Sequence, residues 1–276
     1  MGVWFITGAG RGMGLHIAKA ALAAGHHVVA TGRNAAKVAK ALAPSDNLMV
    51  VKLDVTNAED SVAAAQAAIA RFGRIDVLVN NAANYFGGYF EELSPRQVDL
   101  QLATALTGPM NVTRAILPAM RQQRSGKIIS ISSAAGLVGY EFCTAYSAAK
   151  FGLDGWTEAL HAEVSPFGIQ TMIVNPGFFR TEFLTSDTTQ FADLTVGDYA
   201  DRRAGTEAFM TGMNGAQGGD PAKLAQALIT LDRAPALPRR FLAGADVVAA
   251  AEQKIATLKA EIEAYRALSS SLGIDS

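Results

Sequence analysis

Short apolar runs rich in β-branched residues alternate along the chain with longer Ala-rich stretches whose apolar residues recur at helical spacing. The short runs predict strands at residues 3–7, 27–31, 48–53, 77–79, 128–132 and 171–174. The longer stretches predict helices at residues 12–24, 34–42, 57–71, 95–121, 145–166 and 221–232. Strands that alternate with helices form right-handed βαβ units, so we expect an α/β fold of the doubly wound, Rossmann-like type with a parallel sheet. No linker-like block or internal repeat divides the chain, and we expect one domain over residues 1–276.

Two segments interrupt this alternation. Residues 178–219 are too long for an ordinary connection, and they carry several Phe and Met side chains among Thr, Asp and Gly. We expect a lid over a ligand site there, the alternative being a partly disordered excursion. Residues 246–270 predict an amphipathic C-terminal helix. Its polar face is mixed in charge, so we expect it to pack onto its own domain or a second subunit rather than a membrane.

Charge, cysteine content and histidine spacing limit the partners, the cell compartment and the metal sites that the sequence favours. Lys and Arg together number 24 and Asp and Glu 25, so nothing favours nucleic acid or an anionic membrane as a partner. Cys143 is the single cysteine, which fits a reducing compartment. The chain shows no signal-peptide pattern and no apolar run of about 18 residues, so we expect a cytoplasmic protein. The four histidines show no metal-ligand spacing, and we expect no metal.

A glycine-rich turn joins the first predicted strand to the first helix. Its pattern, T-G-x-x-x-G-x-G, places Gly8, Gly12 and Gly14 between Thr7 and the helix. Glycines allow the backbone to approach a phosphate closely, and the free N–H groups at the start of a helix bind anions. On the first strand of a βαβ series, this turn predicts a pyrophosphate site.

A second motif lies at the start of the predicted helix at residues 145–166. Tyr146 and Lys150 are four residues apart, so the phenol and the ammonium lie on one helical face. Ser132 and Ser133 end the strand before it, at the edge where open α/β sheets place their sites. A cation about 4 Å from a phenol stabilises the phenolate by roughly 4 kcal/mol at an effective dielectric near 20. We therefore expect Lys150 to bring the pKa of Tyr146 toward neutrality for acid–base catalysis.

In these motifs the chain resembles the short-chain dehydrogenase/reductase family over residues 1–243. The marks are the glycine turn, Leu53-Asp54-Val55, Asn80-Asn81-Ala82-Ala83, Ser133, Tyr146 with Lys150, and the stretch from Asn175 to Thr181. The resemblance implies about seven parallel strands, a nicotinamide cofactor, and Ser133, Tyr146 and Lys150 as catalytic residues. The cofactor contacts that the motifs and the resemblance imply are Gly8, Arg11, Gly12, Met13, Gly14, Arg33, Asp54, Val55, Asn81, Ala82, Tyr146, Lys150, Pro176, Gly177, Phe179 and Thr181. The C-terminal residues resemble a branch akin to steroid-type dehydrogenases.

The end of the second predicted strand indicates which cofactor is used. An Asp or Glu there binds the ribose hydroxyls of NAD. Gly32 stands in that place, Arg33 follows it, and Arg11 lies in the glycine turn. Two guanidinium groups can hold the 2′-phosphate of NADP(H), which is therefore the expected cofactor.

Two residues depart from the family pattern. Ala83 replaces the usual Gly beside the cofactor, and Ala105 replaces an Asn whose side chain fixes a local helix kink and whose carbonyl helps hold a proton-relay water. The main hypothesis is a reductase or dehydrogenase acting on a hydrophobic ketone, aldehyde or alcohol. The departures leave open a second one, a nucleotide-binding regulatory or scaffolding protein with little turnover.

The remaining expectations concern the substrate pocket and assembly. Candidates for the pocket wall, each equally compatible with plain packing, are Tyr85, Phe86, Tyr89, Tyr140, Glu141 and Phe142. Packing is favoured over catalysis for Cys143. The family pairs its two long helices across subunits, so we expect a homodimer or homotetramer.

Overall fold

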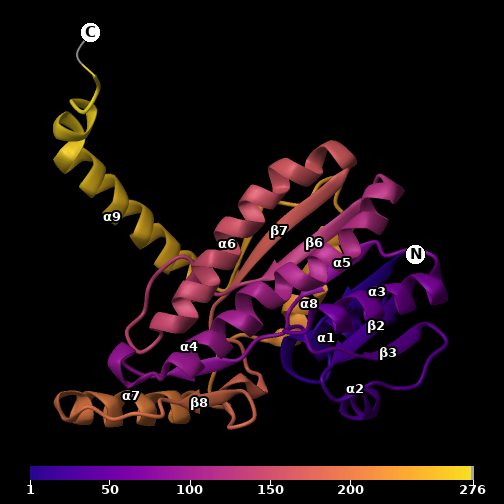
Figure 1. Cartoon of the computed structure of the whole chain (residues 1–276), viewed down its shortest axis with the longest axis horizontal. Helices are drawn as coiled ribbons and strands as arrows, with labels where there is room; N and C mark the ends of the chain where they lie inside the picture. The colour runs from indigo at the N-terminus through magenta and orange to yellow at the C-terminus, as the bar shows by residue number, and fades with distance from the viewer. Residues whose placement is uncertain (275–276) are drawn as a thin grey trace.

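The computed structural model describes residues 1–274 and contains a parallel sheet of seven strands in that range, ordered β3-β2-β1-β4-β6-β7-β9 (Figure 1). The strands are β1 (Val3–Ile6), β2 (His27–Gly32), β3 (Leu48–Lys52), β4 (Val77–Asn80), β6 (Gly126–Ile131), β7 (Ile169–Pro176) and β9 (Arg240–Ala243). The doubly wound parallel sheet expected from the sequence is thus confirmed. The apolar pattern did not predict β9, because three of its four residues are only half-buried.

Helices cover both faces of this sheet. They are α1 (Gly12–Ala23), α2 (Ala35–Ala41), α3 (Ala58–Phe72), α4 (Pro95–Leu102), α5 (Gly108–Gln123), α6 (Thr144–Val164), α7 (Ala200–Met213), α8 (Pro221–Asp232) and α9 (Ala245–Ser270). Side chains alternate across β1: Trp4 and Ile6 join the core beneath α1 and α8, whereas Val3 and Phe5 join the core beneath α3, α5 and α6. Each face therefore has its own apolar core.

The order of the strands places a crevice at one edge of the sheet. The chain builds outward from β1 to β3, returns to β4 beside β1, and then builds outward in the other direction through β6 and β7. Open α/β sheets bind their ligands where the winding reverses, outside the carboxyl ends of the strands. Gly8 follows β1, Asn81 follows β4 and Ser133 follows β6, so the predicted site residues meet at this edge.

The helix expected over residues 95–121 is broken into two by a π-helical turn at Ala103–Thr107. The Gly108 N–H donates to the Ala103 carbonyl, and the Thr107 hydroxyl donates to the same oxygen at 3.2 Å. Ala105 is fully buried in this turn. The chain therefore keeps a helix irregularity at the position where it lacks the family's Asn.

Residues 178–219 are folded against the body. Strand β8 (Thr189–Phe191) pairs with β5 (Tyr85–Gly87), and α7 follows it. Glu92 is fully buried; it accepts the Val196 N–H at 2.9 Å and pairs with Arg203. These bonds attach the segment, hereafter the lid segment, to the residues that follow β5; its role as a lid stays a prediction.

Helix α9 leaves the body and projects away from it (Figure 1). Only Val247 and Ala251 of this helix are buried, whereas residues 252–270 are all exposed. Packing of this helix onto its own domain, one of the two expected arrangements, is therefore wrong beyond its first two turns. Within the described residues, no helix has the length and apolarity needed to cross a membrane.

Candidate active site

The predicted catalytic side chains come together at the carboxyl end of β6. Tyr146 lies in the first turn of α6 and Lys150 one turn later, with the Lys150 Nζ 5.6 Å from the centre of the Tyr146 ring. Lys150 is buried, and its Nζ donates to the Ile131 carbonyl at 2.9 Å. Ser133 faces the same phenol from the second position after β6. Helical spacing and the strand end thus bring together the three groups that the sequence singles out.

Burial shifts the pKa of both members of this pair. Loss of surrounding water raises the pKa of Tyr146 above its ordinary value, and the hydrogen bond with Ser133 only partly offsets that rise. Burial also lowers the pKa of Lys150 to about 8, while the negative charge of Asp154 raises it in part. The expected lowering of the Tyr146 pKa by Lys150 stays a prediction, and desolvation of the phenol acts against it in this arrangement. At neutral pH the pair is a neutral phenol beside an ammonium.

The structure distinguishes the two serines at the end of β6. Ser132 is buried, and its Oγ lies so close to Gly136 that a Cβ there would be 2.6 Å away. Ser133 accepts the Ala135 N–H at 3.1 Å and keeps its hydroxyl toward Tyr146. The geometry therefore supports the choice of Ser133 over its neighbour.

An ionic network that runs from buried Asp154 and Asn175 out to exposed Glu158 lies behind the pair. The Arg240 guanidinium on β9 donates to Asp154 Oδ2 at 2.5 Å, to Asn175 Oδ1 at 2.7 Å and to Glu158 Oε1 at 2.6 Å. Asn175 in turn donates to the Ser133 carbonyl at 2.8 Å. Asp154 follows Lys150 by one helical turn, and that spacing could have revealed it from the sequence. Arg240 carries no such local signal, because its contact depends on the pairing of β9 with β7.

The glycine turn fits a phosphate group. Gly8 has a φ of +66°, and a Cβ on Gly14 would lie 2.4 Å from both the Asn81 Nδ2 and the Gly8 carbonyl. Thr7 holds the end of β4 beside this turn by accepting the N–H groups of Asn81 at 2.9 Å and Ala82 at 3.0 Å. The bare backbone and the N-terminus of α1 form the cradle that a dinucleotide pyrophosphate requires.

Two carboxylates of the lid segment lie at this cradle. Glu182 Oε2 accepts the Gly12 N–H at 3.0 Å. Asp187 Oδ2 accepts from Arg11 at 3.1 Å and from the Lys37 Nζ at 3.0 Å. Lys37, and then Arg11, hold the pKa of Asp187 below its usual value. Lys37, Glu182 and Asp187 were missed from the sequence, because α2 and the lid approach the turn only in the folded chain.

The other predicted cofactor residues lie around the same crevice. Thr181 faces the glycine turn, where a Cβ on Gly12 would meet its Cβ at 3.4 Å. Met13 and Phe179 pack against the core beneath α1. Arg33 is exposed just after β2. Pro176 ends β7, and the Gly177 N–H that follows donates to the Ala243 carbonyl at 3.0 Å.

Asp54 and Val55 have local roles as well. The Asp54 carboxylate accepts the N–H of Thr56 at 3.0 Å and its hydroxyl at 2.8 Å, which closes a turn after β3. Val55 is buried against Gly108, where a Cβ would lie 2.7 Å from its Cγ2. The Asp54 carboxylate is thus engaged by its own loop.

Aromatic rings form a wall beside Tyr146. Tyr85 meets the Tyr146 ring edge-on with centroids 5.4 Å apart, and Phe183 of the lid lies 5.9 Å from it. The Tyr85 hydroxyl donates to the Phe142 carbonyl at 3.0 Å and lies 3.3 Å from the Cys143 sulfur. Phe183 was not among the predicted wall residues, and Tyr85 is the predicted residue that contacts the Tyr146 ring.

The other predicted wall residues serve mainly to attach the lid. Tyr89 stacks on Tyr199 at 4.5 Å between ring centres, and Phe142 lies 6.2 Å from Phe191. Phe86 is buried, and Glu141 pairs with Arg202 of α7. Tyr140 is exposed and contributes no ring contact in the part of the chain that the structure describes.

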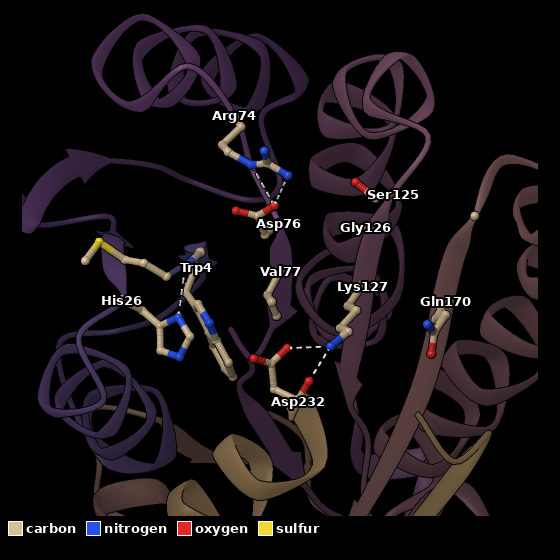
Figure 2. A pocket seen from close by; sticks show the side chains of 13 residues that line it. Trp4, His26, Arg74, Asp76, Val77, Ser125, Gly126, Lys127, Gln170 and Asp232 are labelled. Atoms are coloured by element: carbon tan, nitrogen blue, oxygen red, sulfur yellow. Dashed lines mark hydrogen bonds and ion pairs between the residues drawn. The ribbon is translucent and has the colours of Figure 1, made fainter. Parts of the chain in front are cut away.

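A second hollow lies at the opposite edge of the sheet. This cavity of about 370 Å³ lies among the amino-terminal ends of β1, β4, β6 and β7 (Figure 2). Its charged groups face one another: Lys127 pairs with Asp232 at 2.9 Å and Arg74 with Asp76 at 2.7 Å. His26 also lines it, and its Nδ1 accepts the Gly2 N–H at 3.2 Å. The predicted catalytic residues Ser133, Tyr146 and Lys150 lie at the other edge of the sheet.

A family model for short-chain dehydrogenases matches residues 2–191. This match spans the glycine turn, the end of β4 and the Tyr146 and Lys150 helix. The chain belongs to the short-chain dehydrogenase family.

Individual members are similar over most of the chain. A solved short-chain dehydrogenase from Streptomyces avermitilis is 35% identical, with a TM-score of 0.90 over 99% of this chain and 100% of that one. A 3-ketodihydrosphingosine reductase from Bacteroides thetaiotaomicron is 39% identical over 71% of each chain. A 3-ketoacyl-(acyl-carrier-protein) reductase from Brucella melitensis, solved with NADH, is 25% identical, with a TM-score of 0.72 over 88% of this chain and 96% of that one. This short-chain dehydrogenase is therefore an oxidoreductase whose structural relatives bind nicotinamide cofactors.

Asp154→Asn should move the alkaline limit of turnover to lower pH. The Lys150 ammonium is complete below its pKa of about 8 and is lost as pH rises through that value. Asp154 raises this pKa, so its neutral replacement lets the ammonium deprotonate earlier. The measurement is the pH profile of kcat/KM. Glu158→Gln is the matched control, since it removes the negative charge of another Arg240 partner and should leave the limit in place. An unshifted limit in Asp154→Asn would contradict the assignment.

Proposed function

We propose that this short-chain dehydrogenase reduces the carbonyl group of a hydrophobic ketone or aldehyde with NADPH. The observation that carries the proposal is a neutral phenol, a buried ammonium and a serine hydroxyl converging at the carboxyl edge of the sheet, beside an anion cradle. A bound nicotinamide cofactor supplies the hydride for the carbonyl carbon.

The residues of the chain handle the proton and the developing charge. Tyr146 donates its phenolic proton to the substrate oxygen, and its raised pKa keeps that proton in place at neutral pH. The Lys150 ammonium stabilises the phenolate that forms. Ser133 donates a hydrogen bond that orients the substrate oxygen. A phenol that is protonated before the reaction suits reduction better than alcohol oxidation, which requires the phenolate first.

The wall of the pocket favours an apolar substrate. Tyr85 and the lid's Phe183 present ring surface beside Tyr146. The Bacteroides relative, by its name a 3-ketodihydrosphingosine reductase, supports a ketone as the reducible group. The lid would exclude water when it covers this wall.

The choice of NADPH rests on the cations around Asp187. Arg11 of the glycine turn and Lys37 of α2 both donate to the Oδ2 atom of Asp187. Arg33, the first residue after β2, is exposed. A 2′-phosphate carries the same sign of charge with more acceptor oxygens, and it suits the same donors. Gly32 brings no acid to repel it.

The proposal also covers how subunits assemble and in which cell compartment the protein works. We propose a homodimer or homotetramer in which α5 and α6 face a second subunit; Phe151 on α6 is exposed for that contact. Cys143 is free and buried beneath the active site, which suits a reducing compartment such as the cytoplasm.

Tyr146→Phe should abolish reduction and spare cofactor binding. The variant keeps the ring and removes only the acid, so turnover should fall at least about 100-fold. The measurement is NADPH consumption with a panel of aldehydes, ketones, diketones and steroids, together with NADPH affinity by fluorescence. Tyr140→Phe is the control, because that tyrosine is exposed and should keep full turnover. Near-normal turnover in Tyr146→Phe would refute the catalytic role.

The unmodified enzyme should prefer NADPH to NADH in kcat/KM, and removing the cations should erase that preference. Arg11→Ala and Lys37→Ala should each lower efficiency with NADPH by about ten-fold, the scale of one charged hydrogen bond, and leave NADH unchanged. Lys40→Ala, on the same helix as Lys37, is the control. Placing Asp at position 32 is a poorer test, because its Cβ would lie 2.9 Å from Val38 Cγ2. A preference for NADH would overturn the assignment.

Asp187→Asn should tighten NADPH binding. The carboxylate occupies donors that we assign to the 2′-phosphate, so its neutral replacement removes a competing anion. We expect the Kd for NADPH to fall about two- to five-fold, as suits an exposed ion pair, with the Kd for NADH unchanged. Titration calorimetry measures both constants. Asp198→Asn, in the same lid segment, should change neither; weaker NADPH binding in Asp187→Asn would contradict the competition.

A further inference from the structure

Helix α9 carries an apolar stripe that its own subunit leaves uncovered. Val248, Ile255, Leu258, Ile262 and Tyr265 are exposed large side chains on this helix. With the buried Ala251 between the first two, they follow one another at alternating spacings of three and four residues. This is the spacing of a helix that packs along its length against another helix.

The helix also lacks the support that ordinary helices receive. It has 26 residues, and its burial against the body ends at Ala251. Isolated helices are marginal in water, and most helical stability in proteins comes from packing of an apolar face. Residues 252–270 therefore require a partner along their stripe.

We propose that this partner is α9 of a second copy, paired antiparallel. In such a pair, Ile255 of one copy packs on Leu258 of the other. The charged residues that flank the stripe on either side then meet opposite charges: Glu252 meets Lys259 of the second copy, and Lys254 meets Glu261 of the second copy. Two-fold symmetry doubles each pair, which gives four attractive contacts.

The same charges disfavour the parallel arrangement. In a parallel pair, a residue on one flank of the stripe meets the residue five positions later in the other helix. Lys254 would then face Lys259 of the second copy, and this repulsion would cancel the attraction between Glu261 and Arg266. The surface of α9 is thus complementary to itself in the antiparallel orientation.

The pairing is independent of the contact proposed for α5 and α6. If those helices also hold subunits together, α9 joins two such dimers into a tetramer; otherwise it forms the dimer itself. Either way, disrupting the α9 pair halves the mass of the assembly.

Charge reversal and rescue in the full-length protein test the proposal. Lys254→Glu and Glu261→Lys should each weaken the association at least about ten-fold and halve the mass measured by sedimentation at micromolar concentration and low salt. The double variant restores both pairs with the charges exchanged, so its mass and dissociation constant should return to within about three-fold of the original. Glu263→Lys makes the same charge change off the stripe and is the matched control.

Other outcomes would overturn the proposal. In a parallel pair, Lys254→Glu would strengthen the association, because Glu at position 254 would face Lys259. If Ile255→Glu lowers the mass but the double charge variant does not rescue the single variants, α9 docks on the body of a second subunit instead. If neither the charge variants nor Ile255→Glu change the mass, and circular dichroism shows the helix intact, α9 carries no contact between copies.

Discussion

The buried ammonium of Lys150 is the constraint on which the active site depends. Moving such an ion out of water costs several kcal/mol unless hydrogen bonds and opposite charge compensate it. The Ile131 carbonyl accepts its hydrogen bond, and Asp154 supplies negative charge one turn further along α6. Arg240 then balances Asp154 from β9. The charge of the Lys150 amine is thus stabilised by groups on α6, at the end of β6 and on β9. These elements must fold together, although β9 lies far along the chain.

On the opposite side of the crevice, positive groups are likewise paired with carboxylates. There the backbone N–H groups of the glycine turn and the cations Arg11 and Lys37 form a positive surface, and the lid supplies two carboxylates to it. These carboxylates have the same sign of charge as the phosphates of the proposed cofactor and bond to the donors that we assign to them. The proposed cofactor would therefore compete with Glu182 and Asp187 for these donors. The competition is modest, since Asp187 is mostly exposed and solvent screens its ion pairs.

Local patterns predicted much of this architecture, and long-range contacts account for what they missed. The pairing of Tyr146 with Lys150 depends only on helical spacing, and the strands buried on both faces are recognisable as apolar runs. The half-buried β9 and the three-residue strands β5 and β8 give no comparable signal. Arg240 reaches Asp154 through strand pairing, which no local window of sequence contains. The desolvation that raises the pKa of Tyr146 is likewise a property of the assembled fold and has no local sequence signal.

The junction at the start of α9 connects the projecting helix to the active-site segment. Asp246, in the first turn of α9, accepts the Phe178 N–H at 2.9 Å, directly where the lid segment leaves β7. Gly177 leaves no room for a side chain at this point, since a Cβ there would lie 2.1 Å from the same carboxylate. The start of α9 is therefore held at the beginning of residues 178–219 as well as beside β9. A contact that orients α9 in the proposed pair would therefore act next to Phe178, the residue at which residues 178–219 leave the end of β7.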